Sequence, residues 1–389
     1  MTVIDESLKQ WATPRQAEIV DAVNREGSQR QAAVALGVHP SNVDHALAAL
    51  RRKAAIAGYA PENDMTKPVP SPYVVKGTST LYDKEGNQAL QWVKTSLDKE
   101  RFEEVLKEYI SWLTQDARGV AKVTPQPKFS DTDTLAVYGI GDPHLGMHSW
   151  GKETGADFDL AEAERLNCAA FDRLLTSAPA SETALICEVG DLLHADNNSN
   201  RTPASGNTLD VDSRHSKVMM VAVRMIRHMI GKALTKHQKV IFWGISGNHD
   251  PHSSFAVNLV LAAFYENEPR VEINLSPSPY KMLVFGKVFI GSVHGDGAKM
   301  ADLPGVFSRD FRKEWGETIY SYIYTGHIHH DSRKEFGGCI VESLRTMAPA
   351  DAWHHRAGYR AGRDMRVVVH HRNFGEIERH TANVAMVNQ

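Results

Sequence analysis

Residues 244–253 read GISGNHDPHS, an apolar run that leads through Gly247 into Asn248, His249 and Asp250. An apolar run that ends in Gly-Asn-His-Asp is typical of a buried strand that leaves the core through a tight loop. Polar side chains directly after the C-terminal end of a strand serve binding or catalysis more often than packing. This loop is therefore the first candidate for a functional site.

The same pattern of an apolar run followed by Asp, Asn or His recurs along the chain. The five blocks are GDPHLG (141–146), GDLLHADNN (190–198), GNHD (247–250), VHGD (293–296) and TGHIHH (325–330). From residue 134 onward strand-like runs alternate with helical stretches, which predicts an α/β fold. The C-terminal ends of its strands share one edge of a sheet, so the polar side chains are expected to converge on one crevice. The candidate metal ligands are Asp142, His144, Asp191, Asn248, His294, His327 and His329.

Imidazole, amide and carboxylate ligands without a thiolate suit Mn(II), with Fe or Zn(II) as alternatives. The set holds one carboxylate too few for two separate sites, so we expect Asp191 to bridge two divalent ions, an arrangement that stabilises in-line attack on phosphorus. His249 is adjacent to the ligand Asn248 and is not needed for coordination, which favours a general acid. Asp250 is predicted to orient a neighbouring imidazole.

The order of the five blocks resembles that of the calcineurin-like metallophosphoesterase superfamily over about residues 134–330. The resemblance implies a four-layer α/β/β/α sandwich, a binuclear metal site and hydrolysis of phosphoester bonds. It assigns Asp142, His144, Asp191 and His329 to one ion, and Asp191, Asn248, His294 and His327 to the other. His194, which follows the second Gly-Asp pair, is similar to its counterpart in SbcD-type DNA exonucleases.

Two features depart from the SbcD type. Only residues 331–389 follow the last block, which argues against a segment that docks a coiled-coil ATPase partner. In addition, an extension of about 130 residues precedes the first block. Its first part has three short helical segments with a glycine-containing turn, a helix-turn-helix pattern. The arrangement is similar to phage-encoded proteins that join such a domain to a phosphoesterase. We predict a helix-turn-helix domain over 1–60, a linker, hairpin and helix over 61–130, and the phosphoesterase over 131–389.

Candidate DNA contacts lie in both parts of the chain. On the third helical segment, Asn42 and His45 are expected to face bases and Arg51 and Arg52 to contact phosphates; the alternative is a helical bundle that packs or binds protein. In the loop AWHHRAGYRAGR (352–363), aromatic residues alternate with basic ones, which indicates stacking and phosphate binding or, alternatively, a solvated basic loop. The candidates in the predicted phosphoesterase domain are His194, Arg201, Arg356 and Arg360.

Composition narrows the functional classes. The chain has 389 residues, 42% of them hydrophobic, and a formal net charge of -3, so any nucleic-acid binding must come from local patches. Three widely spaced cysteines indicate reduced thiols, and the sequence shows no signal peptide or apolar run of membrane-spanning length. We expect a cytoplasmic protein without membrane contact, in the host cytoplasm if it is phage-encoded. A homo-oligomer is left open.

The sequence thus predicts a metal-dependent phosphodiesterase that hydrolyses DNA, as an exonuclease or endonuclease. Two alternatives remain at this point. One is a phosphatase or nucleotide phosphodiesterase that acts on a small or protein substrate, because the ligand sets are alike. The other is a DNA-binding regulator with a non-catalytic phosphoesterase domain, against which the complete ligand set argues.

Overall fold

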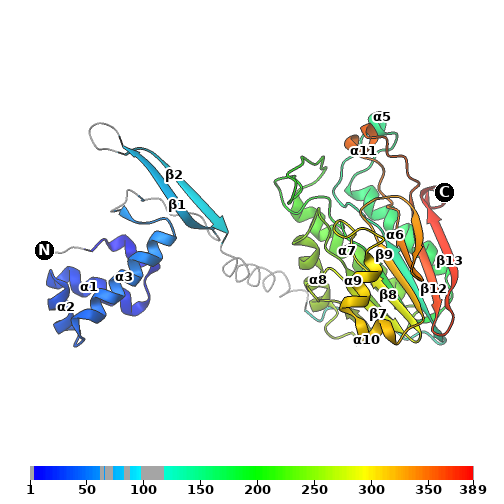
Figure 1. Cartoon of the computed structure of the whole chain (residues 1–389), viewed down its shortest axis with the longest axis horizontal. Coiled ribbons are helices and arrows are strands. Elements are labelled where there is room, and N and C mark those ends of the chain that lie inside the picture. Colours follow the sequence, from blue (N-terminus) through cyan, green and yellow to red (C-terminus); the bar gives the residue numbers. More distant parts are fainter. Residues whose placement is uncertain (1–3, 62–64, 66–72, 83–87, 98–117, 389) are drawn as a thin grey trace. The chain divides into compact units, whose positions relative to one another are not determined.

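The computed structural model describes residues 4–61, 65, 73–82, 88–97 and 118–388. The chain divides into two compact units, Met1–Ser111 and Trp112–Gln389, and each is described by itself (Figure 1). The hairpin turn predicted at Asp83–Asn87 lies outside the described residues, and so does the helix predicted over Leu97–Leu113, apart from its first residue.

The first unit contains short helices and a two-stranded sheet. Its elements are η1 (Glu6–Trp11), α1 (Pro14–Glu26), α2 (Gln29–Ala35), α3 (Pro40–Ile56), β1 (Tyr73–Tyr82) and β2 (Gln88–Leu97). The side chain of Thr13 accepts the backbone N–H of Gln16, and the side chain of Gln16 accepts that of Thr13, a reciprocal capping pair that begins α1. The apolar faces of the helices meet in one core, which includes Val20, Val23, Ala33, Val43, Leu47 and Leu50.

The second unit is built on two sheets. The six-stranded sheet has the order β13-β12-β3-β4-β5-β6, in which β3 to β6 are parallel. Its strands are β3 (Asp131–Ile140), β4 (Ser181–Glu188), β5 (Lys239–Gly244), β6 (Val271–Ile273), β12 (Asp364–His371) and β13 (Gly375–Asn383). The five-stranded sheet has the order β10-β11-β9-β8-β7, with β8, β9 and β11 parallel. Its strands are β7 (Lys281–Phe285), β8 (Val288–Ser292), β9 (Tyr320–Thr325), β10 (Ser332–Phe336) and β11 (Cys339–Ser343). The mixed α/β architecture that the sequence predicted is confirmed.

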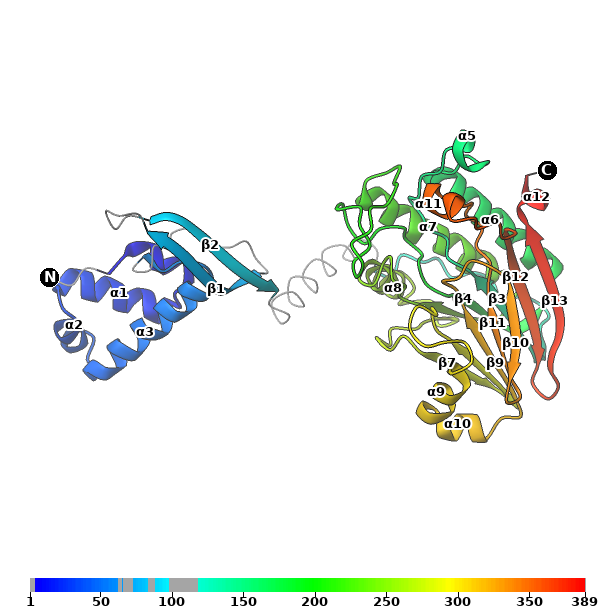
Figure 2. The same ribbon diagram turned by 45° about the horizontal axis from the view of Figure 1, so that its top comes forward.

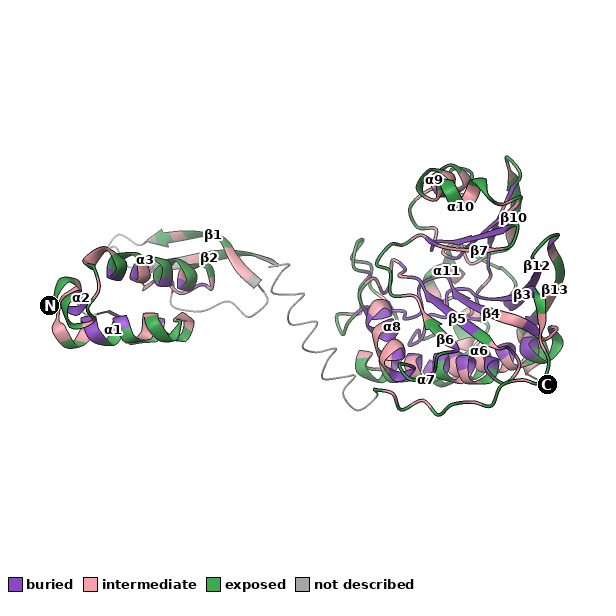
Figure 3. Cartoon of the chain, turned by 90° about the horizontal axis from the view of Figure 1, so that it is seen from below, coloured by how far each residue is buried: buried purple, intermediate pink, exposed green. Residues whose placement is uncertain are grey.

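Helices cover both sheets of the second unit. The described helices of this unit are α5 (Gly151–Thr154), α6 (Leu160–Ser177), α7 (His215–Ala233), α8 (Ser253–Phe264), α9 (Leu303–Asp310), α10 (Arg312–Gly316), α11 (Ala352–Arg356) and α12 (Val384–Val387). α6, α7 and α8 pack on the six-stranded sheet, and α9 and α10 on the five-stranded one (Figure 3). None of the described helices is both long and apolar enough to cross a membrane.

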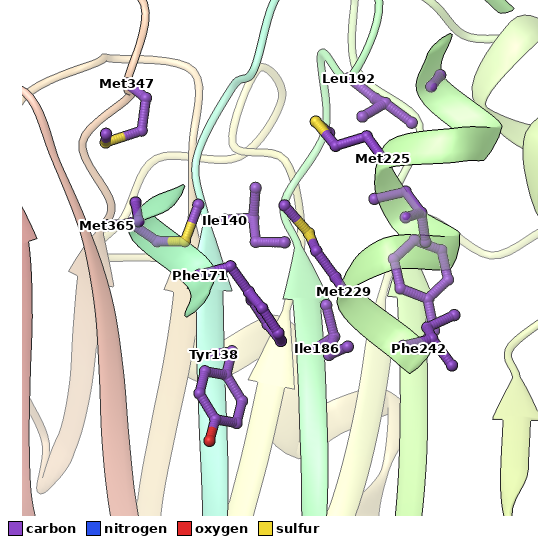
Figure 4. Close-up of a cluster of buried hydrophobic side chains, with 14 of the residues drawn as sticks. Tyr138, Ile140, Phe171, Ile186, Leu192, Met225, Met229, Phe242, Met347 and Met365 are labelled. Carbon is purple, nitrogen blue, oxygen red and sulfur yellow. The ribbon is translucent and has the colours of Figure 1, made fainter. Parts of the chain in front are cut away.

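The buried parts of the central strands are largely apolar because both of their faces pack against other elements. On β3, Ala136 and Tyr138 point to the helices, whereas Leu135 and Val137 point to the other sheet. The helix-facing core is shown in Figure 4, where methionines of α7 and Phe171 of α6 fill the space above the strands. This two-sided burial fixes where each strand ends, and so where its loop leaves the core.

Residues 119–124 belong with the second unit, although they lie in the segment 61–130 that was predicted to hold a linker, a hairpin and a helix. The backbone N–H of Gly119 donates to the carbonyl of Ala263 at 2.9 Å, and that of Ala121 to Phe264 at 3.2 Å. The guanidinium of Arg270 donates to the carbonyl of Thr124 at 2.8 Å. These bonds tie the segment to α8 and to the start of β6.

His237 makes the second unit sensitive to acid. Its Nδ1–H donates to the carbonyl of Ser181 at 2.7 Å, and its Nε2 accepts the hydroxyl of Tyr138 at 2.9 Å, an arrangement that requires the neutral ring. Burial lowers the pKa of His237 from 6.5 to about 4. Below pH 6.5 the unfolded chain therefore binds a proton that the folded chain does not, so stability falls as the pH drops towards 4.

We expect this one group to lower the free energy of unfolding by about 3 kcal/mol between pH 7 and pH 4, at about 1.4 kcal/mol per pKa unit. Urea unfolding of the wild type and of His237→Asn at pH 7 and pH 4.5 measures it. The variant should be less stable at pH 7 but lose less on acidification. Equal losses in the two proteins would show that His237 is not the sensitive group.

Candidate metal centre

Five loops bring the predicted ligands to one edge of the second unit. β3, β4 and β5 are parallel neighbours in one sheet, and β8 and β9 are parallel neighbours in the other, so their C-terminal ends point the same way within each sheet. The sheets face each other across a shared apolar core, which lets the loops meet. The side chains are Asp142 and His144 after β3, Asp191 after β4, Asn248 after β5, His294 after β8, and His327 and His329 after β9.

The ligand atoms gather in two groups. In one group the nitrogens of His144 and His329 and an oxygen of Asp142 all lie within 4.8 Å of one another, and the two Nε2 atoms are 3.1 Å apart. The other group is formed by Asp191, His294 and His327, and its ligand atoms also lie within 4.8 Å of one another. The two groups adjoin, because Nδ1 of His294 lies 3.7 Å from Oδ1 of Asp142.

Nε2 of His294 is the best fixed ligand atom. Nδ1–H of the same ring donates to the carbonyl of Val189 at 2.9 Å, so Nε2 is the nitrogen that faces the other candidate ligands. This nitrogen lies 3.0 Å from Oδ1 of Asn248 and 3.2 Å from Oδ2 of Asp191. An imidazole nitrogen, an amide oxygen and a carboxylate oxygen therefore point at the same space.

The backbone at the ligands is strained. Non-glycine residues rarely adopt positive φ, and doing so costs of order 1–3 kcal/mol each. Five of the seven ligands do: Asp142 (39°), His144 (45°), Asp191 (53°), His327 (68°) and His329 (55°). Such strain concentrates at functional sites, so the clustering points to function rather than to packing.

Glycines let the loops approach one another. A Cβ atom at Gly190 would overlap the imidazole of His294, and one at Gly247 would overlap the carboxylate of Asp191. Gly190 and Gly247 are therefore needed for the close approach of a neighbouring ligand.

Charge within the site is balanced between a few groups. Burial disfavours the charged forms of both Asp191 and His294, but the attraction between the two charges outweighs the effect of burial. The pKa of the Asp191 carboxyl therefore lies well below its usual value, and the pKa of the His294 imidazole rises to about 10. Burial, with nearby imidazoles, lowers the pKa of His329 to about 3 and that of His144 also falls well below 6.5. His144 and His329 are thus neutral at pH 7, as metal ligands must be.

His249 lies beside the ligands. Its backbone N–H donates to Oδ1 of Asp191 at 2.8 Å, and its Nδ1–H donates to the carbonyl of His194 at 2.8 Å. Nε2 is then the nitrogen that can act on a molecule in the cavity that His249 lines. Nitrogens of His144, His194 and His249 also lie within 4.8 Å of one another, so the geometry allows a ligand role for His249 as well as the predicted acid role.

Asp250 does not hold an imidazole, contrary to the role the sequence suggested. Its carboxylate is fully buried and accepts two backbone N–H groups, from Leu193 at 2.9 Å and from Gly247 at 3.1 Å. It therefore joins the loops after β4 and β5.

His194 is a buried neighbour of the candidate ligand His144. It is 1% exposed, its Nδ1 lies 3.3 Å from Nδ1 of His144, and burial lowers its pKa to about 3. This placement favours positioning of His144 over contact with a substrate.

A cavity of about 550 Å³ lies against the candidate centre. Five of its lining residues are Asp191, Asn248, His249, His327 and His329. The other lining residues come from the loop 202–209, from Ile328 and His330 after β9, and from residues in and near α11. Figure 2 shows α11 near α5 at one end of the second unit. A volume of this size falls within the range of small-ligand sites.

His354 is a lining residue that was not among the candidates predicted from the sequence. Its ring stacks on that of His329 with centroids 5.2 Å apart, and Asp351 accepts its Nδ1–H at 2.7 Å. It lies on α11 beyond the last block and does not directly follow a strand, so only the Asp-x-x-His spacing at the start of α11 could have indicated a fixed ring.

The basic candidates are spread over the surface. Arg360 is exposed and donates to the carbonyls of His355 and Tyr359, and Arg201 is exposed and donates to the carbonyl of Gly206. Arg356 is exposed at the end of α11. In the first unit the exposed residues of α3 include Asn42, His45, Arg51 and Arg52.

Comparison with known proteins gives weak likenesses. No family model matches the chain, and no curated protein matches it. Among solved structures, the chain is similar to a predicted phosphoesterase from Streptococcus pneumoniae TIGR4, with 12% identity over 65% of this chain and 99% of that one and a TM-score of 0.26. It is similar to a novel archaeal phosphodiesterase, with 8% identity over 64% of this chain and 99% of that one and a TM-score of 0.33. A third is Vps29 from Entamoeba histolytica complexed with zinc, with 14% identity over 64% of this chain and 98% of that one and a TM-score of 0.26.

Proposed function

We propose that the chain is a metal-dependent phosphodiesterase that hydrolyses phosphodiester bonds in DNA. The observation that carries the proposal is the pair of adjoining ligand groups on the wall of a cavity, with His249 beside them. Neutral imidazoles, an amide and carboxylates fit Mn(II), Fe or Zn(II), and in the proposal Mn(II) is the working ion. The Nε2 atoms of His144 and His329, 3.1 Å apart, lie close enough to be held by one cation.

The residues would divide between two ions. Asp142, His144 and His329 would hold one, and Asn248, His294 and His327 the other, with Asp191 between them. Divalent ions bound there supply Lewis-acid catalysis of attack on phosphorus. His249 would give a proton from Nε2 to the leaving oxygen, while its Nδ1–H bond to the carbonyl of His194 holds the ring in place.

DNA is the proposed substrate because the chain has exposed basic residues on α3. The core of the first unit buries Val43, Leu47 and Leu50 of this helix, and Arg51 and Arg52 are exposed at its C-terminal part. With a net charge of -3, binding to phosphates must come from such local groups. A DNA-binding first unit and a hydrolytic second unit together support a nuclease over a phosphatase of small molecules.

The test uses the full chain and two substrates, an end-labelled oligonucleotide and methyl p-nitrophenyl phosphate, both with Mn(II). We expect both to be cut, and we expect Arg51→Ala/Arg52→Ala to weaken binding to DNA only. Each lost phosphate contact should lower the slope of log affinity against log salt by about 0.9.

A matched control is Arg312→Ala/Lys313→Ala, which removes two exposed charges from α10. α10 precedes β9, so it lies at the end of that strand away from the ligands. The control should keep the wild-type salt slope. Cleavage of the small diester without any cleavage of DNA would replace the nuclease proposal by a small-substrate phosphodiesterase.

A further inference from the structure

Two exposed aromatic side chains line the same cavity as the candidate ligands. Trp353 of α11 is 65% exposed and Tyr359, three residues after the helix, is 44% exposed. Their ring centroids lie 6.0 Å apart at an interplanar angle of 29°, so the two rings are stacked. Large apolar rings left open to solvent inside a cavity mark a surface that gains free energy when a ligand covers it.

The platform, meaning the rings of Trp353 and Tyr359, is connected to the metal centre through His354. This ring contacts Tyr359 edge-on, with centroids 5.3 Å apart, and stacks on the candidate ligand His329. Asp351 fixes it by accepting both its backbone N–H and its Nδ1–H at 2.7 Å. Two successive ring contacts, of Tyr359 with His354 and of His354 with His329, therefore connect the platform to a candidate ligand.

The lining of the cavity indicates what the platform binds. The loop 202–209 contributes Thr202, Ser205, Asn207 and Thr208, whose neutral polar side chains suit a sugar-phosphate backbone. Aromatic rings beside such groups suit a base, since every base has a π-face. A second cavity of about 250 Å³ shares Tyr359, His354 and His329 and adds Arg360, which extends the surface for a strand.

We propose that Trp353 and Tyr359 stack on a nucleobase adjacent to the phosphodiester that is cleaved, so that the substrate presents an unpaired base at that point. Inside a duplex both faces of a base are covered by its neighbours, whereas an unpaired or terminal base has a free face. This inference rests on the proposed nuclease function and specifies its substrate as single-stranded DNA or a strand end with an open base.

A measurement of DNA binding tests the platform independently of catalysis. We compare a thymidine trinucleotide with the same backbone lacking its bases, by calorimetry in the presence of a chelator so that no hydrolysis occurs. The wild type should bind the base-containing strand more tightly, and Trp353→Ala should weaken that binding by about 5- to 150-fold, the range of 1–3 kcal/mol found for base stacking. Binding of the abasic strand should not change, and Trp353→Phe should restore part of the loss.

Phe374→Ala is the matched control. Phe374 is 66% exposed and follows β12, which runs antiparallel to β3, so it lies at the edge of the sheet opposite to the ligands. The control should bind as the wild type does. Equal affinity of the wild type for the two strands, or an equal effect of Trp353→Ala on both, would overturn the platform.

The outcomes distinguish this inference from the function on which it rests. If Trp353→Ala removes the preference for bases but no strand is cut with Mn(II), the platform stands and the nuclease proposal fails. If DNA is cut and Trp353→Ala binds and cuts both strands as the wild type does, the nuclease proposal stands and the platform fails.

Discussion

Replacing His249 with asparagine is expected to lower kcat by about 10²- to 10⁴-fold on a diester with an alkoxide leaving group. The side-chain amide of asparagine can still donate to the carbonyl of His194, and the backbone N–H to Asp191 is unchanged, so the loop should keep its shape. What is lost is the proton that Nε2 gives to the leaving oxygen. The metal content should remain that of the wild type.

The leaving group shows whether His249 acts as an acid. A p-nitrophenolate leaves without protonation, so His249→Asn should slow its release far less than that of an alkoxide. His371→Asn is the matched control, since His371 ends β12 at the edge away from the ligands and its loss should change neither rate. Equal losses with both leaving groups, together with loss of metal, would make His249 a ligand in the group it forms with His144 and His194.

The positions of the ligands could be predicted from sequence because each follows a strand that is buried on both faces. The C-terminal half of β3 and the inner parts of β4 and β5 are apolar runs, at residues 135–140, 184–187 and 240–243, and the candidate ligands follow each run within a few residues. Parallel pairing then brings those ends to one edge, a rule that needs no knowledge of side-chain contacts.

Edge strands could not be predicted in the same way. β10, with the sequence SRKEF, and β13, with GEIERHTAN, form the outer strands of the two sheets, and most of their side chains are exposed or only partly buried. Neither shows an apolar run or a regular alternation. Strand character there comes from pairing with β11 and β12, which is a tertiary effect.

The direction in which a side chain points could not be predicted from the sequence either. Asp250 follows His249 directly, and adjacency suggested a carboxylate that orients an imidazole. In the folded loop the carboxylate turns towards the amides of Leu193 and Gly247, because these buried donors need an acceptor. The stacking of His354 on His329 likewise joins residues from separate loops, and spacing along the chain carries no sign of it.

Asp191→Asn is the second change with a large expected effect. Asp191 is buried, lies 3.2 Å from Nε2 of His294 and is the carboxylate that would stand between both ions. Loss of an outer partner of a metal ligand typically lowers metal affinity by about 10- to 100-fold, so loss of a ligand shared by both ions should lower it by at least about 100-fold. Hydrolysis should fall at least as far.

A second carboxylate in the same loop provides the control. Asp196 accepts the backbone N–H groups of His252 and Ser253 at 3.2 and 2.8 Å, and belongs to neither ligand group. Asp196→Asn should keep the wild-type metal content even where it lowers thermal stability. A loss of metal in both variants would indicate a general effect of disturbing the loop after β4.

The number of divalent ions bound per chain is the measurement that tests the binuclear centre most directly. Chelated protein is dialysed against Mn(II), and its metal content is read by mass spectrometry beside its rate on a small phosphodiester. The wild type should bind two ions per chain and regain hydrolysis with them, and Asp191→Asn should bind fewer and stay inactive. Full hydrolysis by the metal-free protein, or two ions retained by Asp191→Asn, would contradict the centre described here.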